Sequence, residues 1–531
     1  GTPGALASGR GGGGGGGGEG NGEAGAVVRL HSALIAVFTH LVGKLRTVAL
    51  EDANIRGVVF PLLKYSTRVG SPEGEVLVDE AFRLWSVTIA SLPVVPPQLR
   101  ELLPNAAALL RRGRDAAALL PLLEAYLLLD AADSLQPLAV DMGRALEASI
   151  RSTATAVLAA VGASAPSAAG ASGAPPAGNG GGGANATVAI PLSAETPAEA
   201  MAAAALIDVL LQLFLPGGSS AASPAQHGPV VALVAPAMRA MAALLAHPAI
   251  PSAGLNVKII NIFEGFLEVL GRLWLLSPTT LLELVAGLDA AVGGGGAAAA
   301  ASLPPGGGGG PATADGSELS SSSAVDRLLD RWLTIASARF LEEIVGVKTM
   351  SMLGRFRRRM ATLSLSALLM AGCCDQLYEP RKLLRLCSLA MQALADDSEF
   401  AADQTELDSL DFTADLAADT VLARRLSITR ADPVRKVDVH ECVRGVLTKV
   451  AERAGGPEAF MAALASHGAP ERLRTQLAAV LGGLRISAGG VIDGEEPEDS
   501  ADPADEDELY GMLPAMSEGG VPFASSGSTP D

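Results

Sequence analysis

The sequence predicts an all-α fold, an α-α superhelix of the HEAT or armadillo type. Large apolar residues recur every three or four positions in block after block, which is the spacing of one face of an α-helix. No stretch alternates apolar and polar residues as a half-buried strand would. Short separators, often Gly or Pro, join the helices into pairs of about 35 to 45 residues, the period of stacked helical repeats. Because no repeat motif is well defined, an irregular helical bundle is the alternative.

The stretch from Val76 to Leu92 shows the helical spacing most clearly. Its large apolar residues fall on one face: Val78, Phe82, Trp85, Ile89 and Leu92. Asp79 and Glu80 occupy the first turn, where carboxylates complement the positive end of the helix dipole. A helix of about four turns cannot bury this stripe alone. We therefore expect it to pack on neighbouring helices over residues 52–68 and 97–111.

Composition divides the chain into helical blocks and low-complexity segments. We expect HEAT-like helical repeats over residues 26–161, 197–292, 324–395 and 434–486. Segments poor in large apolar groups cannot offset the entropy of ordering, so we expect disorder at residues 1–25 (Gly-rich), 162–196 and 293–323 (linkers) and 487–531 (acidic tail). Residues 396–433 are expected as an acidic loop region with room for one short helix, because residues 396–419 hold nine acidic residues and no basic one.

Gly and Pro separators place the individual helices within the first three blocks. In the first block they are expected over residues 27–45, 52–68, 76–92, 97–111, 115–129 and 134–161. In the second block they are expected over residues 197–215, 230–246, 255–276 and 278–292. In the third block they are expected over residues 324–345, 348–371 and 381–395.

Charge and hydropathy bound the classes of partner. The net charge is −18, but Asp493 to Glu508 carries ten acidic residues and no basic one, which leaves −8 for the rest. No basic domain is present, so nucleic acid is not an expected partner. The mean hydropathy of +0.34 comes largely from alanine. The most apolar runs, residues 198–215 and 230–246, contain Asp208 and Arg239, so we expect no membrane insertion. The chain begins with Gly1 rather than Met, and we expect it to be a fragment.

The sequence contains no pattern of catalytic or cofactor-binding residues. Six scattered histidines show no metal-binding spacing, and the glycine runs do not form a phosphate-binding loop. Four cysteines lack the spacing of a disulfide framework or a zinc site, which fits a reducing compartment: Cys373, Cys374, Cys387 and Cys442. We therefore expect no enzyme activity, no catalytic or metal-binding residue and no cofactor.

Two groups of residues are candidates for contacts. The densest basic cluster consists of Arg355, Arg357, Arg358 and Arg359. It is either a solvated helix face or a contact with an acidic partner, and that partner could be one of the chain's own acidic segments. The tryptophans Trp85, Trp274 and Trp332 lie at core spacing on amphipathic helices. Packing between helices is favoured for them, and a partner groove is the alternative.

Three stretches, in a common order along the chain, carry a family resemblance. The first is Val58 to Thr67 with the following helix that bears Phe82 and Trp85. The second is Asp330-Arg331-Trp332, followed by Arg357-Arg358-Arg359 and the leucine-rich residues 363–369. The third is Asp432-Pro433-Val434, followed by residues 439–447 and by Gly456, Phe460 and Met461. Together they resemble the C-terminal half of the importin-β superfamily, and its importin-eleven branch most of all.

The resemblance implies a nuclear import receptor (karyopherin) built from HEAT repeats, with Phe82, Trp85 and Trp332 in its core. Such a receptor binds protein cargo, passes nuclear pores through weak contacts with Phe-Gly nucleoporins, releases cargo on binding Ran-GTP, and shuttles between nucleus and cytoplasm. The family's main Ran site is in its N-terminal repeats, and this sequence contains no counterpart of them. The alternative is a non-enzymatic HEAT-repeat scaffold for cytosolic protein assembly.

Overall fold

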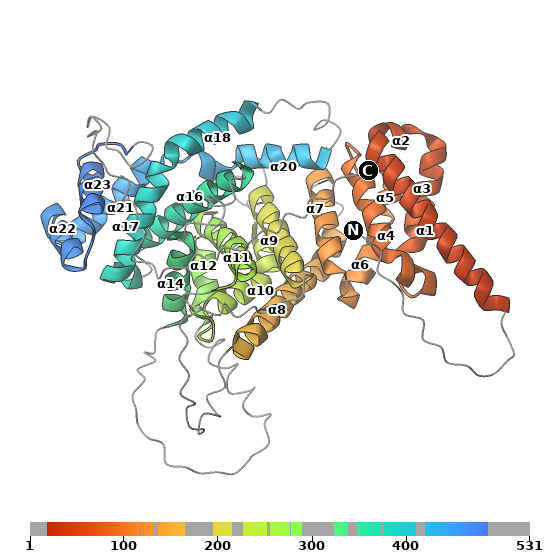
Figure 1. The fold of residues 1–531 in the computed structure, drawn as a ribbon, viewed down its shortest axis with the longest axis horizontal. Helices are drawn as coiled ribbons and strands as arrows, with labels where there is room; N and C mark the ends of the chain where they lie inside the picture. Colours follow the sequence, from red (N-terminus) through yellow and green to blue (C-terminus); the bar gives the residue numbers. More distant parts are fainter. Residues whose placement is uncertain are drawn as a thin grey trace, which may run out of the picture. The chain divides into compact units, whose positions relative to one another are not determined.

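The computed structural model describes most of the helical blocks. Its described residues are 19–113, 115–130, 135–164, 195–214, 227–251, 255–276, 278–288, 323–337, 348–372, 375–409 and 420–486. Within these ranges the regular elements are helices, and no strand is formed (Figure 1). The predicted all-α fold of stacked helices is thus confirmed. Residues 1–18, nearly all of both low-complexity linkers, Cys373, Cys374 and the acidic tail lie outside the described residues.

The chain forms two compact units. Unit 1 comprises the residues up to Leu138 together with residues 414–423, and unit 2 comprises the remainder. The helices of unit 1 are α1 (Glu19–Leu45), α2 (Thr47–Glu51), α3 (Ala53–Ser66), α4 (Pro72–Ala90), α5 (Pro97–Arg100), α6 (Leu103–Arg112), α7 (Ala116–Asp130) and the 3-10 turn η1 (Gln136–Leu138). In this unit α4 packs against α1, α3 and α7, so the amphipathic stripe of α4 is covered by its neighbours.

The α4 helix begins four residues earlier than the predicted start at Val76. Ser71 is its N-cap, and the Ser71 hydroxyl accepts a hydrogen bond from the Gly74 amide at 2.9 Å. Pro72 follows at the first helical position, where a missing N–H has no consequence. A Cβ atom on Gly74 would lie 2.4 Å from the Arg68 carbonyl oxygen, so this cap requires glycine. The apolar spacing did not reveal this polar first turn.

Two further boundaries in unit 1 differ from the prediction. The helix expected over residues 97–111 is divided into α5 and α6, because Pro104 lacks an N–H and its ring clashes with the carbonyl of Arg100. The segment expected to be disordered up to residue 25 is helical from Glu19 onward. Once the first turns of α1 are packed, each added residue gains a backbone hydrogen bond, so the helix continues into glycine-containing sequence.

Unit 2 contains the other helices of the described residues. These are α8 (Ala139–Ser164), α9 (Glu195–Phe214), α10 (His227–Leu245), α11 (Val257–Leu276), α12 (Pro278–Ala286), α14 (Ala324–Ser337), α16 (Lys348–Ala371), η3 (Asp375–Tyr378), α17 (Pro380–Ala395), α18 (Asp397–Ser409), α20 (Thr420–Ala431, whose first four residues belong to unit 1), η4 (Pro433–Lys436), α21 (Val439–Arg453), α22 (Pro457–Ser466) and α23 (Glu471–Leu481). The α11 helix is its centre and contacts α9, α10, α12, α14 and α16. Most of α11 between Ile259 and Trp274 is buried.

The region expected as an acidic loop with room for one short helix, residues 396–433, contains more helix than expected: α18, α20 and η4. Asp397 and Glu399 stand in the first turn of α18, where they complement the helix dipole. Arginines of α16 neutralise the remaining charge, as shown below. The acidic sequence therefore forms a helix because its counter-charges come from another element.

Candidate protein-contact site

The basic cluster lies on α16 and faces acidic side chains of the same unit. Arg355 makes a two-pronged contact with Asp403 of α18, with Nε and Nη2 at 2.7 and 2.8 Å from the two carboxylate oxygens. Its Nη1 lies 2.8 Å from Glu399 of the same helix. The Arg355 side chain is only 11% exposed. Paired planar contacts of this kind are among the stronger ion pairs, so Arg355 fixes α18 on α16.

The next arginines fix the start of α18. Arg358 Nε lies 2.7 Å from Asp396, and Arg359 Nη1 lies 2.5 Å from Asp397. Arg359 also donates to the backbone carbonyls of Val434, at 3.2 Å, and Val437. Burial lowers the pKa of the Arg359 guanidinium, against the opposing effect of Asp397. Arg359 thus joins α16, α18 and the η4 segment.

Phe400 is the aromatic centre of this contact. Its ring is 4% exposed, with the Arg359 guanidinium 4.5 Å and the Arg435 guanidinium 5.6 Å from the ring centroid. Arg435 also lies 4.6 Å from the ring of Phe356 on α16, and its Nη1 donates to Gln404 of α18 at 3.1 Å. Guanidinium groups over aromatic faces are attracted by the ring quadrupole. The residues form a layered stack of aromatic rings and cations.

Arg357 contacts a different helix. It pairs with Glu264 and, at 3.3 Å, with Glu268, both on α11. Of the two alternatives that the sequence left open, the structure thus shows a contact of the arginine cluster with acidic segments of its own chain. A contact of these arginines with another protein stays a prediction.

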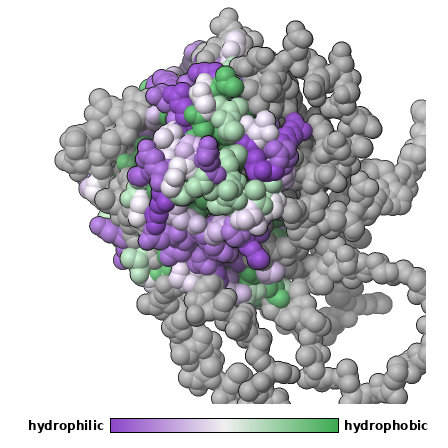
Figure 2. Space-filling view, turned by 90° about the vertical axis from the view of Figure 1, so that its left-hand side faces the viewer, coloured by the Kyte–Doolittle hydropathy of each residue, from purple (hydrophilic) through white to green (hydrophobic). Residues whose placement is uncertain are grey.

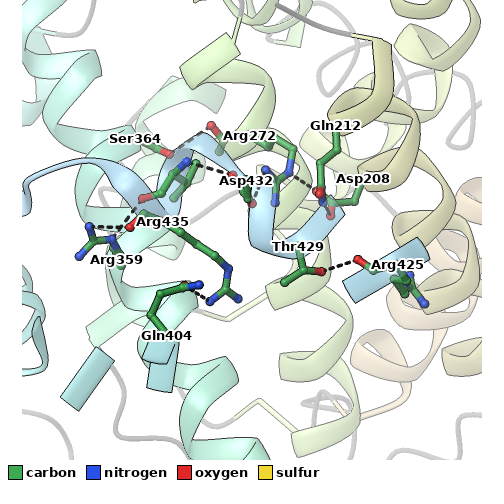
Figure 3. Close-up of polar contacts among 12 residues, drawn as sticks. Asp208, Gln212, Arg272, Arg359, Ser364, Gln404, Arg425, Thr429, Asp432 and Arg435 are labelled. Carbon is green, nitrogen blue, oxygen red and sulfur yellow. Dashed lines mark hydrogen bonds and ion pairs between the residues drawn. The ribbon is translucent and has the colours of Figure 1, made fainter. Parts of the chain in front are cut away.

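A buried ion-pair network extends from α11 to the η4 segment (Figure 3). Arg272 is 2% exposed and pairs with Asp208 of α9 and, at 2.8 Å, with Asp432. Asp432 also accepts a hydrogen bond from the Val434 amide at 3.0 Å and so begins η4. Burial by itself lowers the pKa of Arg272, but the carboxylates of Asp208, Asp432 and Glu268 outweigh it and raise that pKa. We name Arg272 with Asp208 and Asp432 the hub. The sequence did not predict it, because its members lie far apart in the chain.

The tryptophans occupy the cores of their units. In unit 1, Trp85 is fully buried, and its Nε1 donates to the Tyr126 hydroxyl at 3.0 Å. That hydroxyl donates to the Leu99 carbonyl at 2.7 Å, so α4, α7 and α5 are joined by one chain of hydrogen bonds. Burial raises the pKa of Tyr126, although the bond from Trp85 acts in the opposite direction. Phe82 is 3% exposed in the same core.

In unit 2, Arg331 of the segment Asp330-Arg331-Trp332 joins α14 to the end of α10 and to the loop that follows it. Arg331 donates to the carbonyls of Leu245, at the end of α10, and Ile250. These contacts satisfy backbone groups that have no partner within the helix. Burial lowers the pKa of Arg331 to about 10, and the neighbouring Arg327 adds to the effect. Trp332 is 2% exposed, and Trp274 on α11 is fully buried.

Cavities within the described residues are of two kinds. A small one of about 30 Å³ lies among α11, α14 and α16, beside Trp332, Glu264 and Arg357. That volume holds about one water molecule. A larger, open groove of about 510 Å³ lies between α1 and α4, beside His40, Lys44 and other residues. Among the described side chains, no three His, Cys, Asp or Glu gather as metal ligands would.

Apolar residues on α1 form an exposed stripe. Val27, Leu30, Val37 and Leu45 are 45–60% exposed and recur at helical spacing. The buried residues Ile35 and Val42 lie on a neighbouring face of the same helix. The α1 helix is thus apolar over more of its circumference than unit 1 covers. By contrast, the end of unit 2 that carries α22 and α23 shows only a small hydrophobic patch among hydrophilic residues (Figure 2).

Three helical segments in the described part of the chain have the length and apolar composition needed to cross a membrane. They are Gly25–Leu45, Thr196–Phe214 and Gly228–Leu245. The second and third belong to α9 and α10, which pack against α8 and α11. Asp208 of α9 is engaged by Arg272, as a packed interior requires. That none of the three segments is inserted in a membrane stays a prediction.

Comparison with known proteins places these helices in a family. The model of the importin-11-like family, described as TPR repeats, matches residues 32–471. Importin-11 of Homo sapiens is 24% identical over 108 residues, which is 20% of this chain and 11% of importin-11. No solved structure matches the chain. The resemblance to the importin-β superfamily and its importin-eleven branch is thereby confirmed, and since the family model covers most of the sequence, the chain belongs to the importin-11-like family.

Proposed function

We propose that this chain is part of a nuclear transport receptor that binds protein cargo in a Ran-GTP-regulated cycle. The observation that carries the proposal is the family match over residues 32–471. A family of stacked helical repeats acts by presenting extended surfaces to proteins, and it requires no catalytic group. The proposal therefore includes no enzyme activity and no cofactor.

The exposed stripe on α1 supports a protein-binding role. Apolar patches of several side chains are uncommon on protein surfaces that have no partner. Val27, Leu30, Val37 and Leu45 provide such a patch in unit 1, and Val48 of α2 is 66% exposed as well. We infer that cargo contacts include this stripe. A basic and polar groove between α1 and α4 lies on the same unit and provides hydrogen-bonding groups.

The other steps of the transport cycle are proposed for the complete protein. Release of cargo by Ran-GTP, weak contacts with Phe-Gly nucleoporins and shuttling between nucleus and cytoplasm are proposed from family membership. The match spans 11% of human importin-11, so these activities concern a longer protein than the matched segment.

A binding assay tests the proposal. The full-length protein is immobilised and offered Ran loaded with GTP or with GDP, and a Phe-Gly repeat segment is offered separately. We expect retention of Ran-GTP over Ran-GDP and weak retention of the repeats. A protein that retains neither ligand contradicts the transport role and favours the cytosolic scaffold. When the immobilised protein is also offered cell extract as a source of cargo, Leu30→Asp with Val37→Asp should reduce the retained cargo and leave Ran-GTP binding unchanged. The exposed substitution Arg444→Glu on α21 serves as control.

A further inference from the structure

The α18 helix is held on unit 2 mainly by charge. Its contacts with α16 and η4 described above come from five side chains, of which three are carboxylates: Asp397, Glu399, Phe400, Asp403 and Gln404. Ala401, Ala402 and Thr405 on the same helix are exposed. Phe400 is its only large apolar side chain that is buried among the described residues. The described contacts of α18 are thus those expected of a short acidic peptide bound to a basic surface, and they differ from the apolar contacts of a core helix.

The surface that receives α18 has a defined composition. We name it the arginine face, and it consists of Arg355, Phe356, Arg358, Arg359 and Arg435. Burial lowers the pKa of both Arg359 and Arg435, against nearby carboxylates that raise it. Cations held in such surroundings are destabilising without counter-charges. The arginine face therefore requires an acidic occupant.

We propose that the arginine face is a binding site for acidic helical segments that carry a phenylalanine between carboxylates, and that α18 is its built-in occupant. A partner protein presenting the same pattern, carboxylates on both sides of one aromatic ring, replaces α18. Exchange is feasible because the salt bridges of the partly exposed Glu399 (61%) and Asp397 (29%) contribute little individually, while the buried Asp403 (8%) makes the contact that an incoming carboxylate must replace. An exchange keeps the guanidinium groups paired, whereas simple departure of α18 does not. This inference is independent of the transport cycle and would hold equally in a scaffold.

The aromatic ring makes a protein segment the preferred ligand over a nucleic acid. The Phe400 ring contacts two guanidinium groups, those of Arg359 and Arg435, at 4.5 and 5.6 Å from its centroid, and Asp403 provides the two-pronged contact with Arg355. The spacing of the two residues, three positions apart, places them on one face of a helix. The phosphate groups of a nucleic acid could pair with the arginines as carboxylates do, but they do not supply an aromatic side chain and carboxylates on one face of a helix.

A labelled peptide tests the proposal on the whole chain. The probe is a fluorescent peptide with the sequence of residues 396–409, and binding is followed by anisotropy. The unmodified chain is compared with a variant whose own α18 is weakened by Phe400→Ala and Asp403→Asn. We expect the variant to bind the peptide at least about tenfold more tightly, because its site is vacated more often. Rising salt should weaken this binding.

Matched controls distinguish specific binding of the peptide at the arginine face from nonspecific electrostatic attraction. A peptide of the same composition with the phenylalanine and the aspartates rearranged should bind weakly, and adding Arg355→Glu and Arg358→Glu to the weakened variant should abolish binding. Arg444→Glu, which changes an exposed arginine on α21, should not. The proposal is overturned if the folded variant fails to bind the peptide, if both chains bind it equally, or if a single-stranded oligonucleotide displaces it as well as unlabelled peptide does.

A second measurement applies if the weakened variant does not fold. Amide hydrogen exchange is recorded on the unmodified chain with and without excess unlabelled peptide. Displacement predicts faster exchange in α18 and unchanged exchange in α11, which is buried in the core of the unit. Unchanged exchange in α18 at high peptide concentration contradicts the proposal.

Discussion

Two helices, α11 and α18, pack on α16 in different ways. The difference explains why the sequence predicted α11 and not α18, and why we propose that α18 can be replaced by a partner. The α11 helix is buried along most of its length and contributes large side chains such as Phe263, Phe266 and Trp274 to the core. The α18 helix contributes Phe400 and a set of carboxylates. Apolar burial of about 25 cal/mol per Å² holds α11, whereas α18 is held by ion pairs, of which the one between Arg355 and Asp403 is largely buried and the one between Arg355 and Glu399 is partly exposed. The first contact is part of the core, and the second is the one that we propose to be exchangeable.

The largest expected loss in the free energy of unfolding comes from removing Arg272, the buried cation of α11. Arg272→Ala leaves Asp208 and Asp432 without their shared partner, and Asp432 is 2% exposed. Breaking a buried pair in this way costs about 3 to 5 kcal/mol. We expect this loss in the free energy of unfolding, measured by chemical denaturation.

A matched control lies on the same helix. Lys258 is exposed at the start of α11, so Lys258→Ala should change the free energy of unfolding by less than about 0.5 kcal/mol. Equal effects of the two substitutions would show that Arg272 is not the hub that its contacts indicate.

The contrast between the two helices also explains what the sequence could predict. The apolar spacing of residues 255–276 predicted α11 to within two residues, because its stabilising partners are apolar and interchangeable. It did not predict α18, whose ion pairs join residues 38 to 48 positions apart. Nor did it predict the hub, in which Arg272 is 64 positions from Asp208 and 160 from Asp432. Charge pairs are specific to their partners, and the partners are known only from the fold.

The second largest change in stability is expected at Gly271, where α11 packs closely against α14 and α16. A Cβ atom on Gly271 would lie 2.9 Å from the Ser364 hydroxyl of α16 and 3.2 Å from Trp332 of α14. Gly271→Ala should therefore destabilise the chain by about 1 to 3 kcal/mol, despite the better helix propensity of alanine. Thermal unfolding monitored by circular dichroism measures the change.

Gly445 on α21 provides the opposite case. No atom outside its own helix lies within 4 Å of a Cβ placed there. Gly445→Ala should stabilise the chain by about 0.4 to 1 kcal/mol, since alanine restricts the unfolded chain and favours the helix. If both substitutions shifted stability in the same direction, steric contact at Gly271 would not be the cause.

The smallest effect on global stability, and the most local one, is expected at α18. Asp403→Asn weakens the two-pronged contact with Arg355, whose side chain is 11% exposed. Because Phe400 is the one large apolar group buried among the described side chains of α18, detachment of this helix should not require α11 or the rest of the core to unfold. We expect the midpoint of global unfolding to change little, while amide exchange in α18 becomes faster and, with one ion pair fewer to screen, less sensitive to salt. Thr405→Ala, at an exposed position of the same helix, should leave that exchange nearly unchanged. If Asp403→Asn instead lowered global stability as much as Arg272→Ala, α18 would be a core element and the distinction between the two helices would fail.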